Sequence, residues 1–510
     1  MKKFFITTAI DYANGRPHIG HAYEKILADV IARNARLSGK DVYFMTGLDE
    51  HGQKVEQSAA RRGIPPKVLC DEVADDFKTL CGTLGVSYDY YIRTTDEYHR
   101  SFVQKCLQKL FDSGEIYKAE YTGLYSLNAE RFVQEKDKVN GAWPADYGQV
   151  TEITETNYFF RLKKHQRWLI DYIGAHPDFI YPKFRAKQVI EFLKEPINDL
   201  CISRPKERLS WGIELPFDKE YVTYVWFDAL LNYISGVNFG DKKLADYWPA
   251  DYHIIGKDIL VPAHSVYWPI MLHVLDYELP RTFLTHGWWL SSGEKMSKSS
   301  GNVVNPLDYI EEFGPEPFRY YLMREMSVGQ DCDFNHDRFV SRYVTDLGND
   351  LGNLLSRVVN MLHRYCDGII PSLDVTNPAI LELRELWDGT GRSVLADYGD
   401  LAFNSALGRL FSFIAFINKF IEMNAPWRLA KSADSGARTQ LEVVLAAASE
   451  SIRLAALLLA PVMPVTASKI LVALGADPEV SWSKLDFGPH LANKTAVENV
   501  ILFPRKEANL

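Results

Sequence analysis

The fold is decided near the amino terminus, where residues 3–52 read KFFITTAIDYANGRPHIGHAYEKILADVIARNARLSGKDVYFMTGLDEHG. Residues 3–8 and 42–45 are apolar runs typical of buried strands. Between them, apolar residues recur at helical spacing from Pro17 to about Leu37, which predicts a helix with proline at its first position. This order predicts a doubly wound, Rossmann-like α/β parallel sheet, in which ligands bind at the carboxyl ends of the strands.

The rest of the chain divides by pattern. A length of 510 residues is too great for a single core. Residues 97–223 are aromatic-rich and irregular, and they predict an insertion. Strand-like runs return at 222–227 and 252–255. From about 340 to 475 the sequence is rich in Leu, Ala and Val at helical spacing, which predicts an α-helical bundle.

Composition excludes several classes of protein. Hydrophobic residues make up 47% and charged residues 24%, and no run of about 18 apolar residues occurs, so we expect no membrane span. The amino terminus leads directly into an expected strand, without room for a targeting segment, and we expect a cytoplasmic protein. The net charge of −9 argues weakly against a nucleic-acid partner, although net charge says little about one local face.

Cysteine spacing bears on metals and disulfides. The six cysteines lie far apart and form no C-x-x-C pair. That spacing argues against a disulfide framework and against a structural zinc site.

Two histidines open the first predicted helix. His18 and His21 share one helix face, and a helix amino terminus offers unsatisfied N–H groups and a partial positive charge. This combination suits phosphate, particularly charge that develops in a transition state. Gly20 leaves space for a nucleotide to lie close to the backbone. Taken alone, the pair fits two surface histidines beside a turn equally well.

A second polar segment, residues 295–299, reads KMSKS and lies between Gly293 and Gly301. Lysines and serines in a movable loop can close over a triphosphate and neutralise a departing pyrophosphate. Alone, such a segment is usually a solvated loop. Together, in this order and in these expected local structures, H-I-G-H and K-M-S-K-S resemble the two signatures of the class I aminoacyl-tRNA synthetases.

The resemblance implies a known chemistry. An amino-acid carboxylate attacks the α-phosphate of ATP, which carries Mg²⁺, and an aminoacyl adenylate and pyrophosphate result. The substrate is the nucleophile, so catalysis is positioning and charge stabilisation. By resemblance, the catalytic residues are His18, His21, Lys295 and Lys298. The residues expected to bind ATP are Gly20, Gly256, Asp258, Met296, Ser297 and Lys298.

Residues 224–233, YVWFDALLNY, resemble the amino-acid pocket of methionyl-tRNA synthetases. Aromatic walls suit the polarizable thioether of methionine. Asp49 matches the carboxylate that holds the substrate α-amino group. By the same resemblance, the methionine pocket comprises Ile10, Tyr12, Asp49, Trp226, Ala229, Tyr233, Ile259, His264 and Trp268.

Residues 255–259, IGKDI, resemble the adenosine-binding stretch of the same family, through Gly256 and Asp258. The spacing from Asp258 to His264 is one residue longer than the usual pattern, and we expect Pro262 to absorb the extra residue at a helix start. Residues 202–204, ISR, resemble a further family motif, in which Arg204 supports the active site from the insertion; the alternative is a surface arginine.

In the predicted bundle, Asn349, Asn353 and Arg357 recur at four-residue intervals, and residues 424–427 read NAPW. This pattern resembles the anticodon-reading surface of the family, with Asn349, Asn353, Arg357 and Trp427 contacting the CAU anticodon of tRNA(Met). Unstacked loop bases are usually held by aromatic stacking and by hydrogen bonds to base edges. A helix cap and a half-buried tryptophan explain the pattern equally well.

The resemblance gives a domain plan and several expectations. We expect residues 1–96 and 224–289 to form the two halves of the catalytic domain, 97–223 the connective insertion, 290–340 a stem-contact region with the KMSKS loop, and 341–510 the anticodon-binding domain. Many relatives carry zinc knuckles in the insertion, but Ser126 and Ala129 stand where a C-x-x-C pair would be, so we expect no structural zinc. Because the chain ends soon after the bundle, we expect a monomer.

Other readings compete with this one. A class I synthetase for leucine, isoleucine, valine or cysteine is the nearest, although the first three normally carry a larger editing insertion. A nucleotidyltransferase with H-x-G-H would explain neither KMSKS nor the bundle. An inactive RNA-binding homologue is disfavoured because both signatures are intact.

Overall fold

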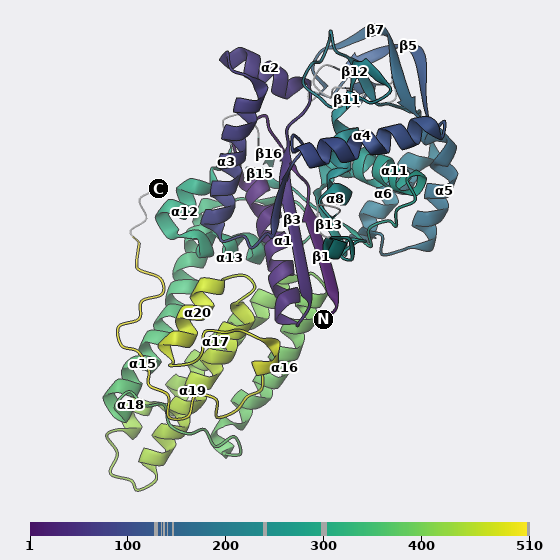
Figure 1. The fold of residues 1–510 in the computed structure, drawn as a ribbon. Coiled ribbons are helices and arrows are strands. Elements are labelled where there is room, and N and C mark those ends of the chain that lie inside the picture. Colours follow the sequence, from purple (N-terminus) through teal and green to yellow (C-terminus); the bar gives the residue numbers. More distant parts are fainter. Residues whose placement is uncertain are drawn as a thin grey trace.

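The computed structural model describes residues 1–126, 131–133, 135, 138–139, 141–144, 147–237, 242–296 and 303–506. The molecule is elongated, with a central sheet, a smaller β-rich part beside it and a helical bundle below (Figure 1). The expected α/β catalytic fold followed by a helical bundle is therefore confirmed.

The central sheet is parallel throughout. Its order is β2-β3-β1-β13-β14-β8, with β4 also paired to β3. The strands are β1 (Lys3–Thr8), β2 (Asp11–Tyr12), β3 (Asp41–Asp49), β4 (Tyr90–Arg93), β8 (Ile180–Tyr181), β13 (Tyr252–Gly256) and β14 (Phe283–His286). The interior strands are buried on both faces, as parallel sheets covered by helices are.

Helix α1 (Ile19–Leu37) packs against β1 and β3 on one side and against α3 (Pro66–Leu84) and α13 (Pro315–Glu325) on the other. It is therefore an interior helix. The prediction that Pro17 occupies its first position is wrong: His18 is the N-cap, and its ring supplies the capping acceptor that a proline cannot.

The run 222–227 is not one strand. β12 (Asp218–Thr223) ends there and α7 (Val225–Leu230) begins two residues later. A short apolar run does not distinguish a strand from a buried helix by its period. β12 also belongs to a small antiparallel sheet, ordered β10-β12-β11, and not to the catalytic sheet.

The insertion is built on an antiparallel sheet ordered β6-β5-β7-β9, flanked by helices. One strand from this stretch, β8, returns to the central sheet. The elements are α4 (Glu97–Asp112), β5 (Ile116–Ser126), β6 (Arg131–Val133), β7 (Val150–Phe160), α5 (Leu162–Ala175), α6 (Lys183–Lys194), β9 (Leu200–Cys201), β10 (Ser203–Pro205) and β11 (Glu214–Leu215).

Shorter elements complete the catalytic part and lead to the bundle. They are α2 (Gln53–Arg62), α8 (Asn232–Ser235), α9 (Lys242–Ala245), α10 (Lys257–Ile259), η3 (Leu260–Tyr267), α11 (Trp268–Val274), β15 (Trp289–Ser291), β16 (Glu294–Lys295), α12 (Pro306–Phe313) and β17 (Cys332–Asp333).

The bundle is centred on α19 (Ala437–Leu459), which is buried along almost its whole length. Around it lie α14 (His336–Arg342), η4 (Tyr343–Gly352), α15 (Asn353–Cys366), η5 (Pro378–Ile380), α16 (Leu381–Gly399), α17 (Phe403–Asn424), α18 (Pro426–Leu429) and α20 (Pro464–Ala473). No helix in the part of the chain that the structure describes is long and apolar enough to cross a membrane.

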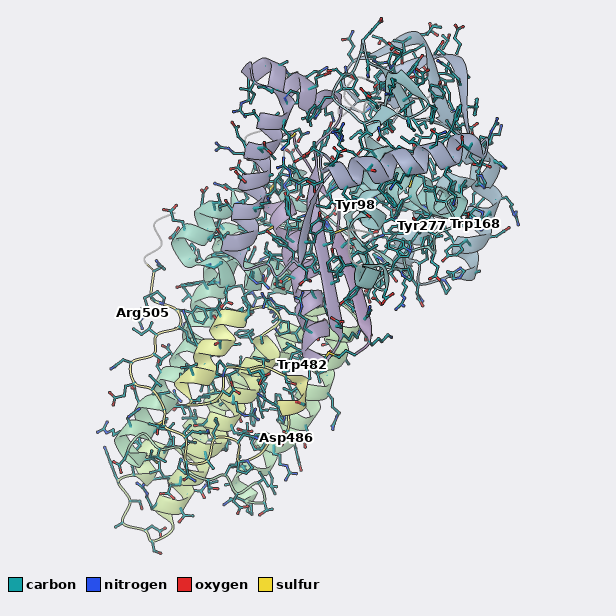
Figure 2. The ribbon with its side chains drawn as sticks, in the orientation of Figure 1. Tyr98, Trp168, Tyr277, Trp482, Asp486 and Arg505 are labelled. Carbon is teal, nitrogen blue, oxygen red and sulfur yellow. The ribbon has the colours of Figure 1, made fainter. Side chains whose placement is uncertain are left out.

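After α20 the chain runs back over the bundle, through η6 (Trp482–Lys484), towards α12 (Figure 1). Trp482 lies where this segment meets the catalytic part (Figure 2), and its indole N–H donates to Asn34 Oδ1 on α1 at 3.2 Å. The C-terminal segment therefore ties the bundle to the helix that carries the two histidines.

Candidate active site

A cavity of about 470 Å³ lies at the carboxyl ends of β1 and β13. The chain continues from β1 into α1 and from β13 into α10 and η3, so the cavity is at the place where a doubly wound sheet binds its ligand. The predicted site residues that line it are Ile10, Tyr12, His18, Gly20, His21, Asp49, Trp226, Ala229, Tyr233, Gly256, Asp258, Ile259, His264 and Met296.

The amino terminus of α1 forms one wall of this cavity. His18 Nδ1 accepts from the backbone N–H of Gly20 at 3.0 Å, and the N–H of His18 donates to His21 Nδ1 at 3.1 Å. The two rings lie 3.8 Å apart, centre to centre. A Cβ at position 20 would approach His18 Cε1 to 2.9 Å. Glycine therefore allows the His18 ring to fold back over the start of the helix, and it also leaves room for a ligand there. The wall combines imidazoles with helix N–H groups, which suits an anion.

A second wall of the cavity is neutral and aromatic, and its residues come from α7, α8 and η3. The Tyr233 hydroxyl is 2.9 Å from His264 Nε2, and His264 Nδ1 is 2.9 Å from the carbonyl of Ile259. Because a carbonyl only accepts, Nδ1 carries the proton and Nε2 accepts from tyrosine. Burial lowers the pKa of His264 to about 4, so the ring is neutral. The ring of Trp226 packs edge-on against that of His264, with the ring centres 6.0 Å apart. Together these side chains form an uncharged aromatic wall.

The extra residue between Asp258 and His264 is accommodated by a break in the helix. Val261, within η3, has an extended backbone, with φ −113° and ψ 128°, and separates two helical segments. The helix resumes at Pro262, and His264 still reaches the cavity. Trp268 lies behind this wall: it is fully buried, and its ring packs 5.7 Å from that of Tyr233.

A buried carboxylate is presented by the end of β3. Asp49 is 8% exposed and faces the cavity. Two residues further on, His51 Nδ1 bonds Asp228 Oδ2 on α7 at 3.0 Å. This bond fixes the end of β3 against the helix that carries Trp226 and Ala229, so the carboxylate and the aromatic wall hold one geometry.

The sequence analysis missed a charged cluster whose members Asp11, Glu24 and His286 line the cavity, with Lys25 buried behind them. Lys25 Nζ lies 3.0 Å from Asp11 and 3.2 Å from Glu24, and Glu24 Oε2 lies 3.0 Å from His286 Nε2. Burial raises the pKa of Asp11 to about 7. Burial alone would also raise the pKa of Glu24, but Lys25 and His286 hold it below its ordinary value. Two features could have indicated that these residues reach the cavity: Glu24 follows His21 by about one helical turn, and His286 is the last residue of a parallel strand.

The KMSKS segment is described only in part. β15 and β16 form a hairpin whose turn contains Gly293 at φ +76°, and Met296 then reaches the cavity. The side chain of Lys295 and residues Ser297 and Lys298 lie outside the described part of the chain.

Arg204 is buried, which excludes the surface alternative. It lies beside a neighbouring cavity of about 320 Å³, with its guanidinium 4.7 Å from the ring of Tyr224 and 5.4 Å from that of Tyr125. Because Tyr224 immediately precedes α7, Arg204 packs beside the start of the helix that carries Trp226.

The four bundle residues lie far from the cavity. Asn353 Nδ2 donates to Asn349 Oδ1 at 3.3 Å, across the junction of η4 and α15. Arg357 Nη1 pairs with Glu422 on α17 at 2.7 Å, while Trp427 on α18 packs half-buried against the bundle core. In Figure 1, α15 runs along one side of the bundle and α18 lies near its lower end, both away from the central sheet.

In the stretch expected to lack zinc ligands, a hydrogen bond joins the end of β5 to the segment that precedes β7. Ser126 Oγ donates to the carbonyl of Tyr147 at 2.6 Å, and Ala129 lies outside the described residues. Within the described ranges, no three His, Cys, Asp or Glu side chains gather in a group suited to a metal ion.

The sheet and its cavity define a nucleotide-binding α/β protein with a helical appendage. A family model described as tRNA synthetases class I (M) matches residues 4–152 and 145–359. The methionine–tRNA ligase of Deinococcus radiodurans is 42% identical over 99% of this chain and 75% of its own length. That of Caldanaerobacter subterraneus subsp. tengcongensis is 41% identical over 99% and 79%. The Mycobacterium tuberculosis methionyl-tRNA synthetase in complex with methionyl-adenylate superposes with a TM-score of 0.93, at 39% identity, over 99% of this chain and 100% of that one.

The chain belongs to the class I tRNA synthetases, in the methionyl-tRNA synthetase family. The resemblance seen in its motifs is confirmed, and the protein is an enzyme.

Proposed function

We propose that the protein activates L-methionine with ATP, giving methionyl adenylate and pyrophosphate, and then transfers methionine to the 3′ end of tRNA(Met). The observation that carries this proposal is a single cavity with two chemistries. Its α1 wall offers His18 and His21 at a helix amino terminus, and its other wall is neutral and aromatic. Such a cavity suits a substrate that is anionic on one side and apolar on the other.

Methionine binds with its thioether against Trp226, Tyr233 and His264 and its α-amino group at Asp49. The neutral His264 matters because a charged imidazole would oppose burial of an apolar side chain. Ile10, Tyr12, Ala229 and Ile259 complete the wall, and Trp268 supports Tyr233 from behind. The methionine carboxylate is thereby left to face the nucleotide.

ATP enters as its Mg²⁺ complex, with adenosine near Gly256 and Asp258 and the phosphates at the start of α1. His18 and His21 stabilise the charge that develops at the α-phosphate, and Lys295 and Lys298 neutralise the leaving pyrophosphate. Met296, which lines the cavity, and Ser297 bring this loop over the nucleotide.

The bundle recognises the CAU anticodon through Asn349, Asn353, Arg357 and Trp427. Support comes from their exposure: Asn349 and Asn353 are exposed, and the side chain of Arg357 is 38% exposed. The domain limits 1–96, 97–223, 224–289, 290–340 and 341–510 belong to the same proposal, as do a monomeric, cytoplasmic protein and an insertion without zinc.

The test is ATP–pyrophosphate exchange against a panel of amino acids. Exchange that depends on methionine supports the proposal, and exchange that depends on leucine, isoleucine, valine or cysteine overturns it. Elemental analysis of the purified protein tests the zinc-free insertion, because stoichiometric zinc would contradict it. Sedimentation at micromolar concentration tests the monomer.

A further inference from the structure

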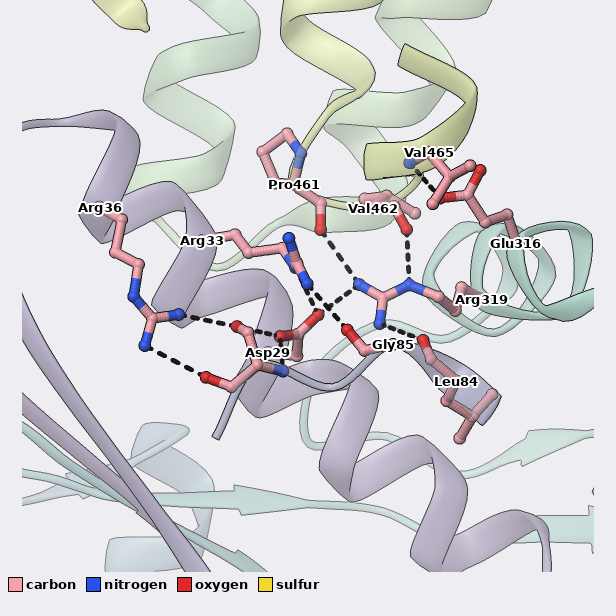
Figure 3. A network of polar contacts seen from close by, with 11 residues as sticks. Asp29, Arg33, Arg36, Leu84, Gly85, Glu316, Arg319, Pro461, Val462 and Val465 are labelled. Carbon is pink, nitrogen blue, oxygen red and sulfur yellow. Dashed lines mark hydrogen bonds and ion pairs between the residues drawn. The ribbon is translucent and has the colours of Figure 1, made fainter. Parts of the chain in front are cut away.

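A buried polar joint connects α13 to three other parts of the molecule that are distant from it in sequence. It consists of Glu316 and Arg319 on α13, Asp29 on α1, Leu84 at the end of α3, and residues 461–466, which lead from α19 into the first turn of α20 (Figure 3). We call this set the Arg319 joint. It lies apart from the catalytic cavity, so the chemistry proposed above uses none of its groups.

Arg319 bonds to all three parts at once. Its Nε donates to the carbonyl of Val462 at 2.7 Å, and its Nη1 donates to that of Leu84 at 3.1 Å. Nη2 donates to Asp29 Oδ2 at 2.6 Å and to the carbonyl of Pro461 at 3.2 Å. The side chain is 1% exposed. A planar guanidinium fixes the directions of all these bonds together, which a lysine ammonium would not do.

Asp29 anchors the joint in the active-site helix. Besides Arg319, its carboxylate accepts from Ser87 N at 2.7 Å, Ser87 Oγ at 2.6 Å and Arg33 Nε at 2.8 Å. Asp29 is two turns along α1 from His21, and α1 is an interior helix. Because Ser87 and Arg33 also hold Asp29 within the catalytic part, α1 keeps its place and gives the joint a fixed point of attachment.

Glu316 anchors the joint in the bundle. Its carboxylate accepts from the backbone N–H groups of Val465 and Thr466, both at 2.6 Å, and from Thr466 Oγ1 at 2.5 Å. These are the first N–H groups of α20, which need an acceptor from outside the helix. α13 is thus bonded to the bundle at two points, Arg319 and Glu316.

We propose that Arg319 and Glu316 are positioning residues for the tRNA-dependent step: they hold the bundle in one orientation relative to α1, so that a tRNA seated on the bundle presents its 3′ end to the adenylate. The inference rests on the proposed anticodon reading by the bundle. Directional bonds suit this task because apolar contacts tolerate sliding, whereas a misplacement of about 1 Å can cost about a hundredfold in rate.

The test uses Arg319→Lys and Glu316→Gln, with Arg33→Met as the matched control. Arg33 pairs with the same Asp29 carboxylate, but its other bond is to Gly85, so it holds the catalytic part alone. Three quantities are measured, each per active site: methionine-dependent pyrophosphate exchange, kcat and KM for aminoacylation of tRNA(Met), and the same constants for that tRNA with an altered anticodon.

For both joint variants we expect exchange within about twofold of the parent, and kcat for aminoacylation about ten- to a hundredfold lower, with KM for tRNA little changed. The preference in kcat for the CAU transcript should shrink by a similar factor, because anticodon contacts no longer position the 3′ end. Arg33→Met should keep the parental preference.

The proposal is overturned if exchange and aminoacylation fall together, or if the anticodon preference is unchanged in both joint variants. A loss of stability alone would lower the melting temperature without altering that preference. Should Arg319→Lys fail to fold, Glu316→Gln carries the test, because it keeps the side-chain shape and one accepting oxygen. A parent enzyme without anticodon preference would instead refute the proposed anticodon role, so the two failures are distinguishable.

Discussion

The catalytic cavity and the proposed anticodon face bind their ligands with differently prepared surfaces. In the cavity, His264 and Asp49 are buried, and Tyr233 fixes the imidazole with a hydrogen bond before any ligand arrives. On the bundle, Asn353 is exposed, and Arg357 is held by a carboxylate that is itself 58% exposed. Under the proposed function, a small substrate would meet groups already in place, whereas an RNA loop would meet side chains that are held less firmly.

The difference has an energetic reason. Burying polar groups costs free energy, and the fold recovers it only where hydrogen bonds or ion pairs satisfy them. In the cavity this cost is offset by hydrogen bonds between buried polar groups, such as that between His51 and Asp228. On the bundle face Asn349 and Asn353 are exposed, so water can satisfy their polar groups. We therefore expect substitutions to cost more in the cavity than on the bundle, in the order that follows.

The largest effect is expected at the start of α1. His21→Ala removes a donor preorganised for the transition state, a loss that typically costs about 10²–10³ in rate. We expect methionine-dependent exchange to fall by that factor while methionine affinity, measured by equilibrium binding, changes little. Lys298→Ala should behave in the same way. If methionine affinity fell as far as the rate, the assignment of these residues to phosphate would be wrong.

The second effect is a dependence of stability on pH that originates in the cavity. The pKa of His264 is about 4 in the fold, against an ordinary value of 6.5, because burial disfavours its charged form. Below pH 6.5 His264 binds a proton in the unfolded chain but stays neutral in the folded chain. The free energy of unfolding is therefore highest above pH 6.5 and decreases as the pH falls towards 4. The contribution is about 3 kcal/mol.

The measurement is the free energy of unfolding of the parent and of His264→Gln between pH 7 and 4. The difference isolates this histidine from other titrating groups. We expect the substituted protein to lose less stability over that range. Parallel curves would mean that the pKa of His264 is the same in the folded and the unfolded chain.

The sequence predicted the cavity better than its supports. The α1 and β3 patterns are local, so the sequence could place these elements, and the resemblance of the two motifs to a family then supplied the site residues. Glu24 and Arg319 could not be placed, because their partners, His286 and Asp29, lie far away in the chain. The run at 222–227 was misjudged because buried strands and short buried helices are equally apolar.

The third expected effect is a loss of aminoacylation without a loss of pyrophosphate exchange, when a residue of the bundle is replaced. Removing one base–aromatic stack costs about 1–3 kcal/mol, or roughly ten- to a hundredfold. We expect Trp427→Ala to lower aminoacylation by that factor and to leave pyrophosphate exchange intact, because exchange needs no tRNA. Arg357→Ala should behave similarly. Equal loss in both reactions, with a lower melting temperature, would mean that Trp427 acts as a core residue.

The smallest effect is expected at Glu422, and it bears most directly on the contrast between the two surfaces. Glu422 pairs with Arg357 at 2.7 Å, but both side chains are more than a third exposed, and exposed ion pairs contribute about 0–1 kcal/mol. Glu422→Gln should therefore leave the free energy of unfolding within about 1 kcal/mol of the parent. Because the guanidinium is then no longer held by a carboxylate, KM for tRNA(Met) should stay the same or fall slightly. A marked rise in KM would mean that this pair prearranges Arg357 for its base, and that the bundle face is prepared in advance as the cavity is.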